Sequence, residues 1–429
     1  MDILEFRTPE EEKKERVLLA GLNATRRDLG ITADDASLDE LADLVRTAGG
    51  EPLARFIQSR EAPDPAFFIG EGKAEELREY VLRLEADLVV FDNELSPVQM
   101  KNLESALNCA VMDRTGIILD IFSSRAQSAE GKLQVELAQY KYLLPRLAGQ
   151  GKNLSRQTAS GGRSPIGTRG PGETKLETDR RRIREKMTRL EHELAEIKRN
   201  RSVQRSRREK SGIPLVALVG YTNAGKSTLL NALTDAGIHT GNRLFDTLDT
   251  TTRRLSFSDG SEALLSDTVG FISKLPTQLV SAFSATLEEL KYASLVLHVA
   301  DMSNPEYPEQ LRVTDELARE LCEPGTPTVY VFTKCDRAPF RIPSGENRIC
   351  ISSVTGEGLE ELVEMIHSRL DCRAIKFETL IPYDRAGALD MLYKNAVVSE
   401  TEYTEEGIRV SGKADAKTYG QLAKLLGKS

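Results

Sequence analysis

Short apolar runs alternate with helical patterns over the first 126 residues of the chain. The apolar runs predict strands at Val17–Leu22, Phe56–Ile57, Phe67–Ile69, Leu88–Phe91 and Ala110–Met112. The intervening segments predict helices at Ser37–Thr47, Ala74–Leu84 and Ser96–Leu107, with Ser37 and Ser96 as N-caps. This alternation indicates an N-terminal α/β domain with a mostly parallel sheet, over residues 1–126.

The pattern changes over residues 127–210, where apolar residues recur at intervals of three and four. The first series is Leu133, Leu137, Tyr140, Leu144 and Leu147. The second is Leu176, Ile183, Met187, Leu190, Leu194 and Ile197, interrupted at Arg180. Because this period puts one apolar stripe on each helix, we predict an antiparallel helical hairpin. The alternative is two long helices that lie on separate globular surfaces.

The segment between these two helices, Gly149–Gly172, is rich in glycine and has no acidic residue. Its basic residues are Lys152, Arg156, Arg163 and Arg169. Such a segment cannot build a core, and we expect it to order only on binding. The second helix ends in a further basic run, Lys198–Lys210. Together they predict a local basic patch, although a solvated linker is the alternative.

Strand–helix alternation returns over residues 211–371. Here we expect strands at Leu215–Val219, Ala263–Ser266, Leu295–Ala300, Val329–Thr333 and Arg348–Ser352. The remaining residues, 372–429, are consistent with the order β-α-β-β-α and predict a small α+β module.

Composition and charge change this picture little. The net charge of -8 argues against a nucleic-acid protein as a whole, so any such function requires the local basic patch. The acidic, polar N-terminus is unlike a signal peptide, and no run approaches the length of a membrane span. The five cysteines and four histidines show no metal-ligand spacing. We expect a cytoplasmic protein.

The segment GYTNAGKST, Gly220–Thr228, lies between a predicted apolar strand and a predicted helix. Its glycines let the backbone wrap closely around phosphate oxygens, and the helix N-terminus faces the anion. Lys226 can reach the β and γ phosphates, and Ser227 can offer its hydroxyl to Mg²⁺. In this strand–loop–helix context, the segment predicts a P-loop.

Three further segments follow in the order that a GTPase requires. At Asp267-Thr268-Val269-Gly270 a carboxylate can hold a magnesium-bound water and the glycine N–H can contact a γ-phosphate. At Thr333-Lys334-Cys335-Asp336 a carboxylate can accept from the N1 and N2 donors of guanine, which adenine does not present. Ser352-Ser353-Val354 can supply backbone N–H groups to the guanine O6. Each segment alone could be an ordinary strand end, but their joint order predicts GTP binding.

At this point the sequence resembles the translational GTPases of the HflX family. The segments that carry the resemblance are FIGEGKAEEL, FDNELSPVQMKNLE, DRTGIILDIFSSRAQSAEGKLQVELAQYKYLLPRL, GTRGPGETKLETDRR, GYTNAGKSTLLNAL, LFDTLDTTTR and DTVGFISKLP. The resemblance implies a GTPase that binds the large ribosomal subunit and splits or rescues stalled or idle ribosomes. It also implies that Phe245–Asp249 is switch I, with Thr247 as its magnesium-contacting residue.

Two positions depart from the usual GTPase pattern. Thr333 replaces the asparagine of the Asn-Lys-x-Asp motif, and the shorter hydroxyl predicts weaker guanine binding while Asp336 keeps the specificity. Phe271 stands where Ras-like GTPases place a water-orienting glutamine, which predicts slow intrinsic hydrolysis.

Asn223 resembles a potassium-coordinating asparagine of related GTPases, although simple loop hydrogen bonding is the alternative. Gly70–Lys73 is better explained as a tight turn than as a phosphate cradle.

The predicted architecture is a Ras-like P-loop G domain (211–371), preceded by the α/β domain and hairpin (127–210) and followed by the α+β module. We expect a monomeric GTPase with Mg²⁺, and with K⁺ if Asn223 coordinates it. Lys226, Thr247 and Gly270 are the expected catalytic residues, and Ser227 and Thr247 the metal ligands. Nucleotide contacts are expected from Gly220, Tyr221, Thr222, Asn223, Ala224, Gly225, Lys226, Ser227, Phe245, Asp246, Thr247, Leu248, Asp249, Asp267, Thr268, Val269, Gly270, Thr333, Lys334, Cys335, Asp336, Ser352, Ser353 and Val354.

Two other functions remain open at this point. One is a pure RNA- or ribosome-binding factor with a vestigial nucleotide switch, which Phe271 favours and which Lys226, Ser227 and Asp267 oppose. The other is a GTPase that acts as a scaffold for an RNA-modifying enzyme. That function requires a partner with its own catalytic residues.

Overall fold

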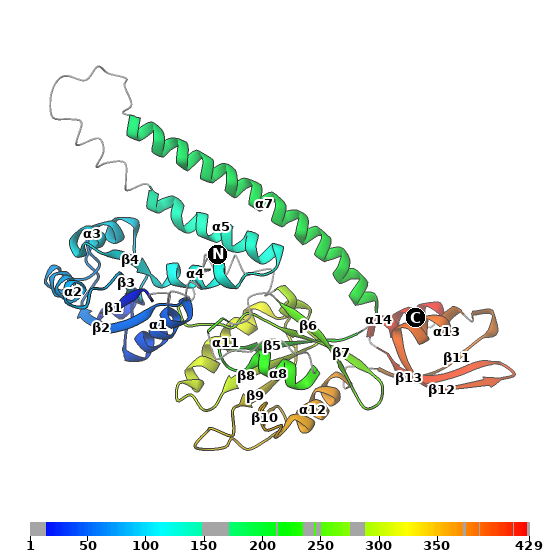
Figure 1. The fold of residues 1–429 in the computed structure, drawn as a ribbon. Coiled ribbons are helices and arrows are strands. Elements are labelled where there is room, and N and C mark those ends of the chain that lie inside the picture. The colour runs from blue at the N-terminus through cyan, green and yellow to red at the C-terminus, as the bar shows by residue number, and fades with distance from the viewer. Residues whose placement is uncertain are drawn as a thin grey trace, which may run out of the picture. The chain divides into compact units, whose positions relative to one another are not determined.

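The computed structural model describes residues 14–147, 171–211, 213–234, 244–245, 250–274, 288–371, 375–385, 387–414 and 416–426. The chain divides into two compact units, residues 1–191 and residues 192–429, which are coloured from blue to green and from green to red in Figure 1. Within the described ranges, no helix combines the length and the apolar character needed to cross a bilayer.

The first unit begins with a four-stranded parallel sheet in the order β2-β1-β3-β4. Its strands are β1 (Arg16–Ala24), β2 (Glu51–Arg60), β3 (Leu88–Phe91) and β4 (Ala110–Asp113). The helices between them are α1 (Asp35–Ala48), α2 (Glu71–Leu84) and α3 (Pro97–Leu107). A parallel sheet needs such crossover helices, so the strand–helix alternation correctly predicts this domain.

Local hydrogen bonds correct two details of the prediction. Ser96 is the N-cap of α3 as expected, but α1 is capped by Asp34, whose carboxylate accepts from Ser37 N at 2.7 Å. Ser37 is the third helical residue and completes this capping box. The strand predicted at Phe67–Ile69 is wrong, because Asp64 Oδ1 accepts from Phe67 N at 3.0 Å and closes a turn there.

Three more helices come after β4: α4 (Arg114–Arg125), α5 (Ala129–Arg146) and α7 (Pro171–Ser211). Helix α7 begins in the first unit and continues past residue 191. Helix α5 and the start of α7 run side by side in opposite directions (Figure 1). Lys186 donates to Tyr140 Oη at 3.0 Å, and Lys141 lies 3.5 Å from Glu191. These contacts between the helices confirm the predicted hairpin within this unit. Helix α7 begins at Pro171, one residue before the predicted end of the loop at Gly172.

Helix α5 also buries a second face, which was not predicted. Val135 and Ala138 are buried, whereas the predicted stripe residues Leu133 and Leu137 are only partly buried. Helix α5 contacts α4 and α3 on this second side. The hairpin therefore begins as part of the N-terminal domain and not as an independent arm.

The second unit contains a six-stranded sheet in the order β10-β9-β8-β5-β7-β6, in which only β6 is antiparallel to its neighbour. Its strands are β5 (Leu215–Gly220), β6 (Thr251–Ser256), β7 (Glu262–Asp267), β8 (Leu295–Asp301), β9 (Thr328–Thr333) and β10 (Arg348–Cys350). The helical segments are α8 (Lys226–Thr234), η3 (Glu288–Tyr292), α11 (Tyr307–Leu321) and α12 (Leu359–Asp371).

Strand β5 lies at the point where the strand order reverses. The chain passes from β5 to β6 and β7 on one side, and then to β8, β9 and β10 on the other. In open α/β sheets, ligands bind outside the carboxyl end of the strand at such a point. The site is therefore expected beyond Gly220, where the P-loop begins.

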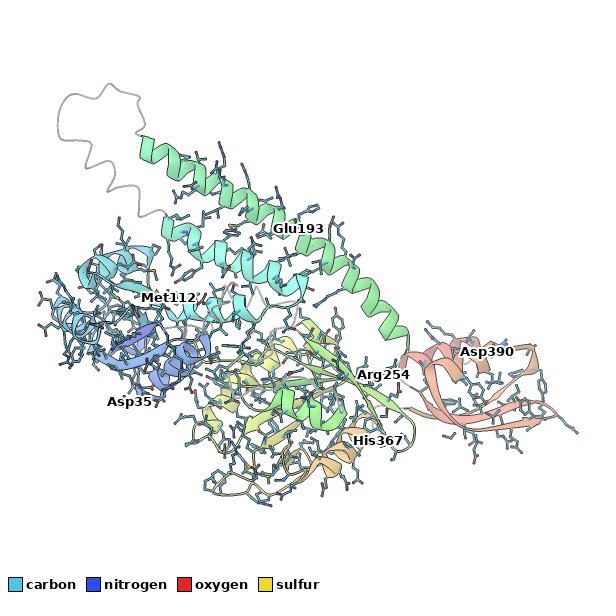
Figure 2. The ribbon with its side chains drawn as sticks, in the orientation of Figure 1. Asp35, Met112, Glu193, Arg254, His367 and Asp390 are labelled. Carbon is cyan, nitrogen blue, oxygen red and sulfur yellow. The ribbon has the colours of Figure 1, made fainter. Side chains whose placement is uncertain are left out.

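Strand β6 was not predicted, and it is an edge strand with largely exposed side chains. Arg254, labelled in Figure 2, points outward from it and donates to Glu262 at 3.1 Å. The described residues of the C-terminal module follow the predicted order. Its elements are β11 (Ile375–Ile381), η4 (Tyr383–Arg385), α13 (Gly387–Asn395), β12 (Ala396–Thr404), β13 (Gly407–Ala414) and α14 (Ala416–Leu425).

Candidate nucleotide site

The P-loop connects the central strand β5 to helix α8. A Cβ atom on Gly220 would collide with the Val299 carbonyl of the neighbouring strand, so the loop can begin there only with glycine. Gly225 has a φ of 88° and Asn223 a φ of 61°, both in the left-handed region. Alternating backbone conformations of this kind turn successive N–H groups inward and form an anion-binding concavity.

Lys226, the first residue of α8, is buried inside this loop. Its Nζ donates to Tyr221 O at 2.9 Å and to Gly220 O at 3.2 Å. Burial lowers the pKa of Lys226 to about 8, an effect that Asp267 partly opposes. A phosphate beside this amine would favour its charged form and raise the pKa again.

A hydroxyl and a carboxylate meet next to the lysine. Ser227 Oγ donates to Asp267 Oδ2 at 2.7 Å, which joins α8 to the end of β7. Asp267 is almost fully buried, and Thr268 Oγ1 donates to Leu218 O at 2.7 Å, which fixes the end of β7 against β5. A hydroxyl and a carboxylate oxygen at this spacing are a donor set that suits Mg²⁺.

The residue after the Asp267–Gly270 segment, Phe271, is hydrogen-bonded to the P-loop through its backbone. Phe271 N donates to Gly220 O at 3.1 Å, and Thr222 N donates to Phe271 O at 2.7 Å. The Phe271 side chain is only 3% exposed. A buried apolar ring has no polar group with which to orient an attacking water, so Phe271 cannot assist hydrolysis in that way.

The predicted base-recognition segment lies at the end of β9. Thr333 Oγ1 is 2.7 Å from Ala224 O and 3.2 Å from Ala300 O, and its single proton can be donated to only one of them at a time. Lys334 Nζ pairs with Asp301 at 2.7 Å and donates to Asn223 O at 3.1 Å. Thr333 and Lys334 thus both contact backbone carbonyls of the P-loop.

Asp336 follows these residues, and its side chain is 28% exposed, so its carboxylate can still accept hydrogen bonds from a base. Ser352 lies two residues beyond the end of β10, because that strand ends at Cys350 and not at Ser352 as predicted. Ser352 N already donates to Glu357 O at 2.9 Å. Any hydrogen bond to a guanine O6 therefore falls to the N–H of Ser353 or Val354, and Val354 is 79% exposed.

Several predicted site residues lie outside the described residues. They are Asp246, Thr247, Leu248 and Asp249 of the predicted switch I, and Lys152, Arg156, Arg163 and Arg169 of the predicted RNA-binding loop. Phe245 is described, and its N–H donates to Thr222 Oγ1 at 2.8 Å.

Two contributions to the site were not predicted. Asp301 orients Lys334, and its position at the carboxyl end of β8 could have identified it. The Tyr221 hydroxyl accepts from Ser273 N at 2.6 Å, whereas the sequence predicted Tyr221 only as a nucleotide contact. A large polar side chain beside the glycines of the P-loop was the available signal.

Four family descriptions match consecutive parts of the chain. "GTP-binding GTPase N-terminal" matches residues 35–123 and "GTP-binding GTPase Middle Region" matches 125–208. "50S ribosome-binding GTPase" matches 215–334, and "HflX C-terminal domain" matches 340–428.

Whole-chain relatives agree with these matches. The GTPase HflX of Lacrimispora saccharolytica is 46% identical over 421 residues, which cover 96% of each chain. The GTPase HflX of Escherichia coli is 42% identical over 385 residues, which cover 88% of this chain and 89% of the relative. A solved structure of a GTP-binding protein from Sulfolobus solfataricus in complex with GDP is 23% identical, with a TM-score of 0.44, and covers 83% of this chain and 98% of that one.

The fold and the P-loop site, together with the family matches and the GTPase HflX relatives, define a P-loop enzyme that binds guanine nucleotides and hydrolyses GTP. The chain belongs to the HflX family of GTPases.

Proposed function

We propose that this GTPase binds the large ribosomal subunit and uses GTP hydrolysis as a timer for splitting or rescuing stalled or idle ribosomes. The observation that carries the proposal is the match of its G domain to the family described as "50S ribosome-binding GTPase". Lys226, Ser227 and Asp267 lie together at the carboxyl edge of the sheet, which opposes a vestigial nucleotide switch.

The reaction is GTP + H₂O → GDP + phosphate, and each site residue has a proposed part in it. Lys226 holds the β and γ phosphates, and the Gly270 N–H contacts the γ-phosphate. Asp336 accepts from N1 and N2 of guanine, while the Lys334 stem lies along the ring. These groups position the nucleotide and stabilise the charge of the transferring phosphoryl group.

Mg²⁺ is the proposed metal of this site. Ser227 and Thr247 would hold it directly, and Asp267 through a bound water. When bound, it neutralises charge on the phosphates. The Ser227–Asp267 pair fits this role, because both groups are hard oxygen donors fixed by helix α8 and strand β7. K⁺ is a further proposal, and it depends on Asn223.

Phe271 makes slow intrinsic hydrolysis part of the proposal. A timer must not run before its target is reached, and a site without a water-orienting polar side chain meets that requirement. The ribosome would then complete the site.

The hairpin loop is the proposed ribosomal RNA contact, through Lys152, Arg156, Arg163 and Arg169. Basic side chains on a glycine-rich backbone can approach phosphates closely and stack on bases. We further propose a monomeric, cytoplasmic protein of four parts, with boundaries near residues 126, 210 and 371.

Co-sedimentation with separated ribosomal subunits tests the proposal. Binding to the large subunit in the presence of a non-hydrolysable GTP analogue, weakened by rising salt, is the expected result. Equal binding to both subunits, or none at low salt, would contradict it. A scaffold for an RNA-modifying enzyme would instead require a partner protein before any effect on RNA is seen.

A further inference from the structure

The Tyr221 side chain links the P-loop to the segment that follows Gly270. Tyr221 is buried, and its hydroxyl accepts from Ser273 N at 2.6 Å. The backbone hydrogen bonds from Phe271 N to Gly220 O and from Thr222 N to Phe271 O form a short parallel ladder between the same segments. The Tyr221 hydroxyl adds a side-chain hydrogen bond two residues beyond Phe271.

The backbone next to this contact is strained. Lys274 has a φ of 53°, a left-handed conformation that is uncommon for residues other than glycine, asparagine and aspartate. Such a conformation persists only where neighbouring contacts enforce it. The hydrogen bond between Tyr221 and Ser273 lies directly before it and is one such contact.

In this arrangement Gly270 lies very close to the P-loop. A Cβ atom on Gly270 would be 2.7 Å from Thr222 Cα and 3.0 Å from Lys226 Nζ. A γ-phosphate that is held by both Lys226 and the Gly270 N–H must lie between these two groups. We therefore expect Gly270 to move outward when GTP binds, whereas GDP has no γ-phosphate and requires no such movement.

We propose that Tyr221 is a positioning residue that sets the preference of the site between GDP and GTP. Its hydroxyl stabilises the arrangement in which residues 270–273 are closed on the P-loop. That arrangement accepts GDP, and the hydrogen bond has to break before the γ-phosphate fits. The inference rests on the proposed roles of Lys226 and Gly270, and it does not depend on the ribosome.

The test uses the full chain and the Tyr221→Phe variant, which removes one hydroxyl and keeps the ring. A single hydrogen bond predicts a change of about two- to tenfold. In titrations with fluorescent nucleotides, we expect the variant to raise the ratio of affinity for a non-hydrolysable GTP analogue to affinity for GDP by that factor. If Tyr221 had only a structural role, the variant would bind both nucleotides more weakly by the same factor. That result, or any other in which the affinity ratio is unchanged, would overturn the proposal.

Tyr330→Phe is the matched control. The Tyr330 hydroxyl donates to Asp315 of α11 at 3.1 Å and takes no part in the contacts between the P-loop and residues 270–273, so its loss should leave the affinity ratio unchanged. Lys226→Ala separates the two levels of the argument. If Lys226→Ala binds both nucleotides normally, the site assignment itself is wrong, whereas a normal ratio in Tyr221→Phe overturns only the role of the hydroxyl.

Hydrogen exchange of the unmodified protein gives a second measurement that needs no variant. The amide of Ser273 should exchange slowly in the GDP complex and faster in the complex with the GTP analogue. Equal protection in both complexes would contradict the proposal.

Discussion

At the scale of single residues, Thr333 shows how one side chain can have a role that its motif does not reveal. The sequence motif indicated only a hydrogen bond lost to guanine. In the structure its hydroxyl lies between the Ala224 and Ala300 carbonyls, so it connects the P-loop to the end of β8. Thr333 is therefore within hydrogen-bond distance of both the P-loop and the end of β8.

Asp336 is expected to determine base selectivity. Asp336→Asn exchanges an acceptor for a donor, so the variant should bind xanthine nucleotides better than guanine nucleotides. Competition between GDP and XDP measures the change, which should exceed about tenfold, because a site left with a mismatched polar group loses affinity strongly. Equal binding of ATP and GTP by the unmodified protein would show that this segment does not select the base.

His298 is expected to couple the stability of the G domain to pH. The ring is buried on β8, packs on Tyr330 with centroids 5.4 Å apart, and hydrogen-bonds to Thr314. Burial lowers the pKa of His298 from 6.5 to about 4, an effect that Asp315 partly opposes. The unfolded chain therefore binds this proton more readily, and stability that is present above pH 6.5 is lost as the pH falls toward 4.

The loss between pH 7 and pH 5 should be about 2 kcal/mol from this residue. Urea unfolding at the two pH values measures it, and His298→Gln removes the titrating group. We expect the variant to be less stable at pH 7 but to lose less stability on acidification. Identical losses in both proteins would assign the pH dependence to other groups.

At the scale of elements, one buried carboxylate holds the first hairpin helix on the N-terminal sheet. Asp113 ends β4 and accepts from Tyr142 Oη at 2.8 Å and Arg146 Nη2 at 2.9 Å, both on α5. It also accepts from Gly116 N at 3.0 Å and Leu95 N at 3.2 Å. Helix α5 thus leaves the domain in a fixed direction, just before the predicted RNA-binding loop.

Asp113→Ala should destabilise this unit by about 3 kcal/mol or more, because it leaves the partly buried guanidinium of Arg146 and several buried donors without their acceptor. Denaturant unfolding followed by a probe in residues 1–191 measures the change. Asp43→Ala is the control, since Asp43 pairs with Arg46 on the surface and its loss should cost less than about 1 kcal/mol. Similar effects of the two changes would show that Asp113 is not an anchor.

The predicted RNA-binding loop can be tested with a triple variant. Changing Arg156, Arg163 and Arg169 to Ala should weaken binding to the large subunit and reduce the slope of log affinity against log salt by about 2 to 3. GTP affinity should not change. Normal binding at every salt concentration would mean that the loop is a connector.

The sequence predicted an element correctly where the signal lay within the element itself. Apolar runs correctly predicted the buried strands β1, β3, β5 and β8, whereas β6 was missed because its side chains are mostly polar and exposed. Phe67–Ile69 looked like a strand, but Asp64 closes a turn there. The contact between Thr333 and Ala224 spans 109 residues, and no local pattern reports such a contact.

At the scale of the whole molecule, the acidic chain with a net charge of -8 carries its predicted RNA contacts on a local basic loop. The nucleotide site is at the edge of a separate sheet. The order of the motifs predicted that the P-loop, Asp267–Gly270 and Thr333–Asp336 lie at strand ends, and in the structure they follow β5, β7 and β9 of one sheet. The contacts of Tyr221 and Asp301 required the structure, since they depend on how those strand ends meet.

The rate of GTP hydrolysis with and without large ribosomal subunits tests the central claim most directly. Multiple-turnover assays of the isolated protein should give slow hydrolysis, because Phe271 cannot orient water. Added large subunits should raise the rate by at least about tenfold if positioning is the missing contribution. Replacing sodium with potassium in the same assay tests Asn223, since only a coordinated cation depends on ionic radius. A fast rate for the isolated protein that large subunits leave unchanged would contradict the account.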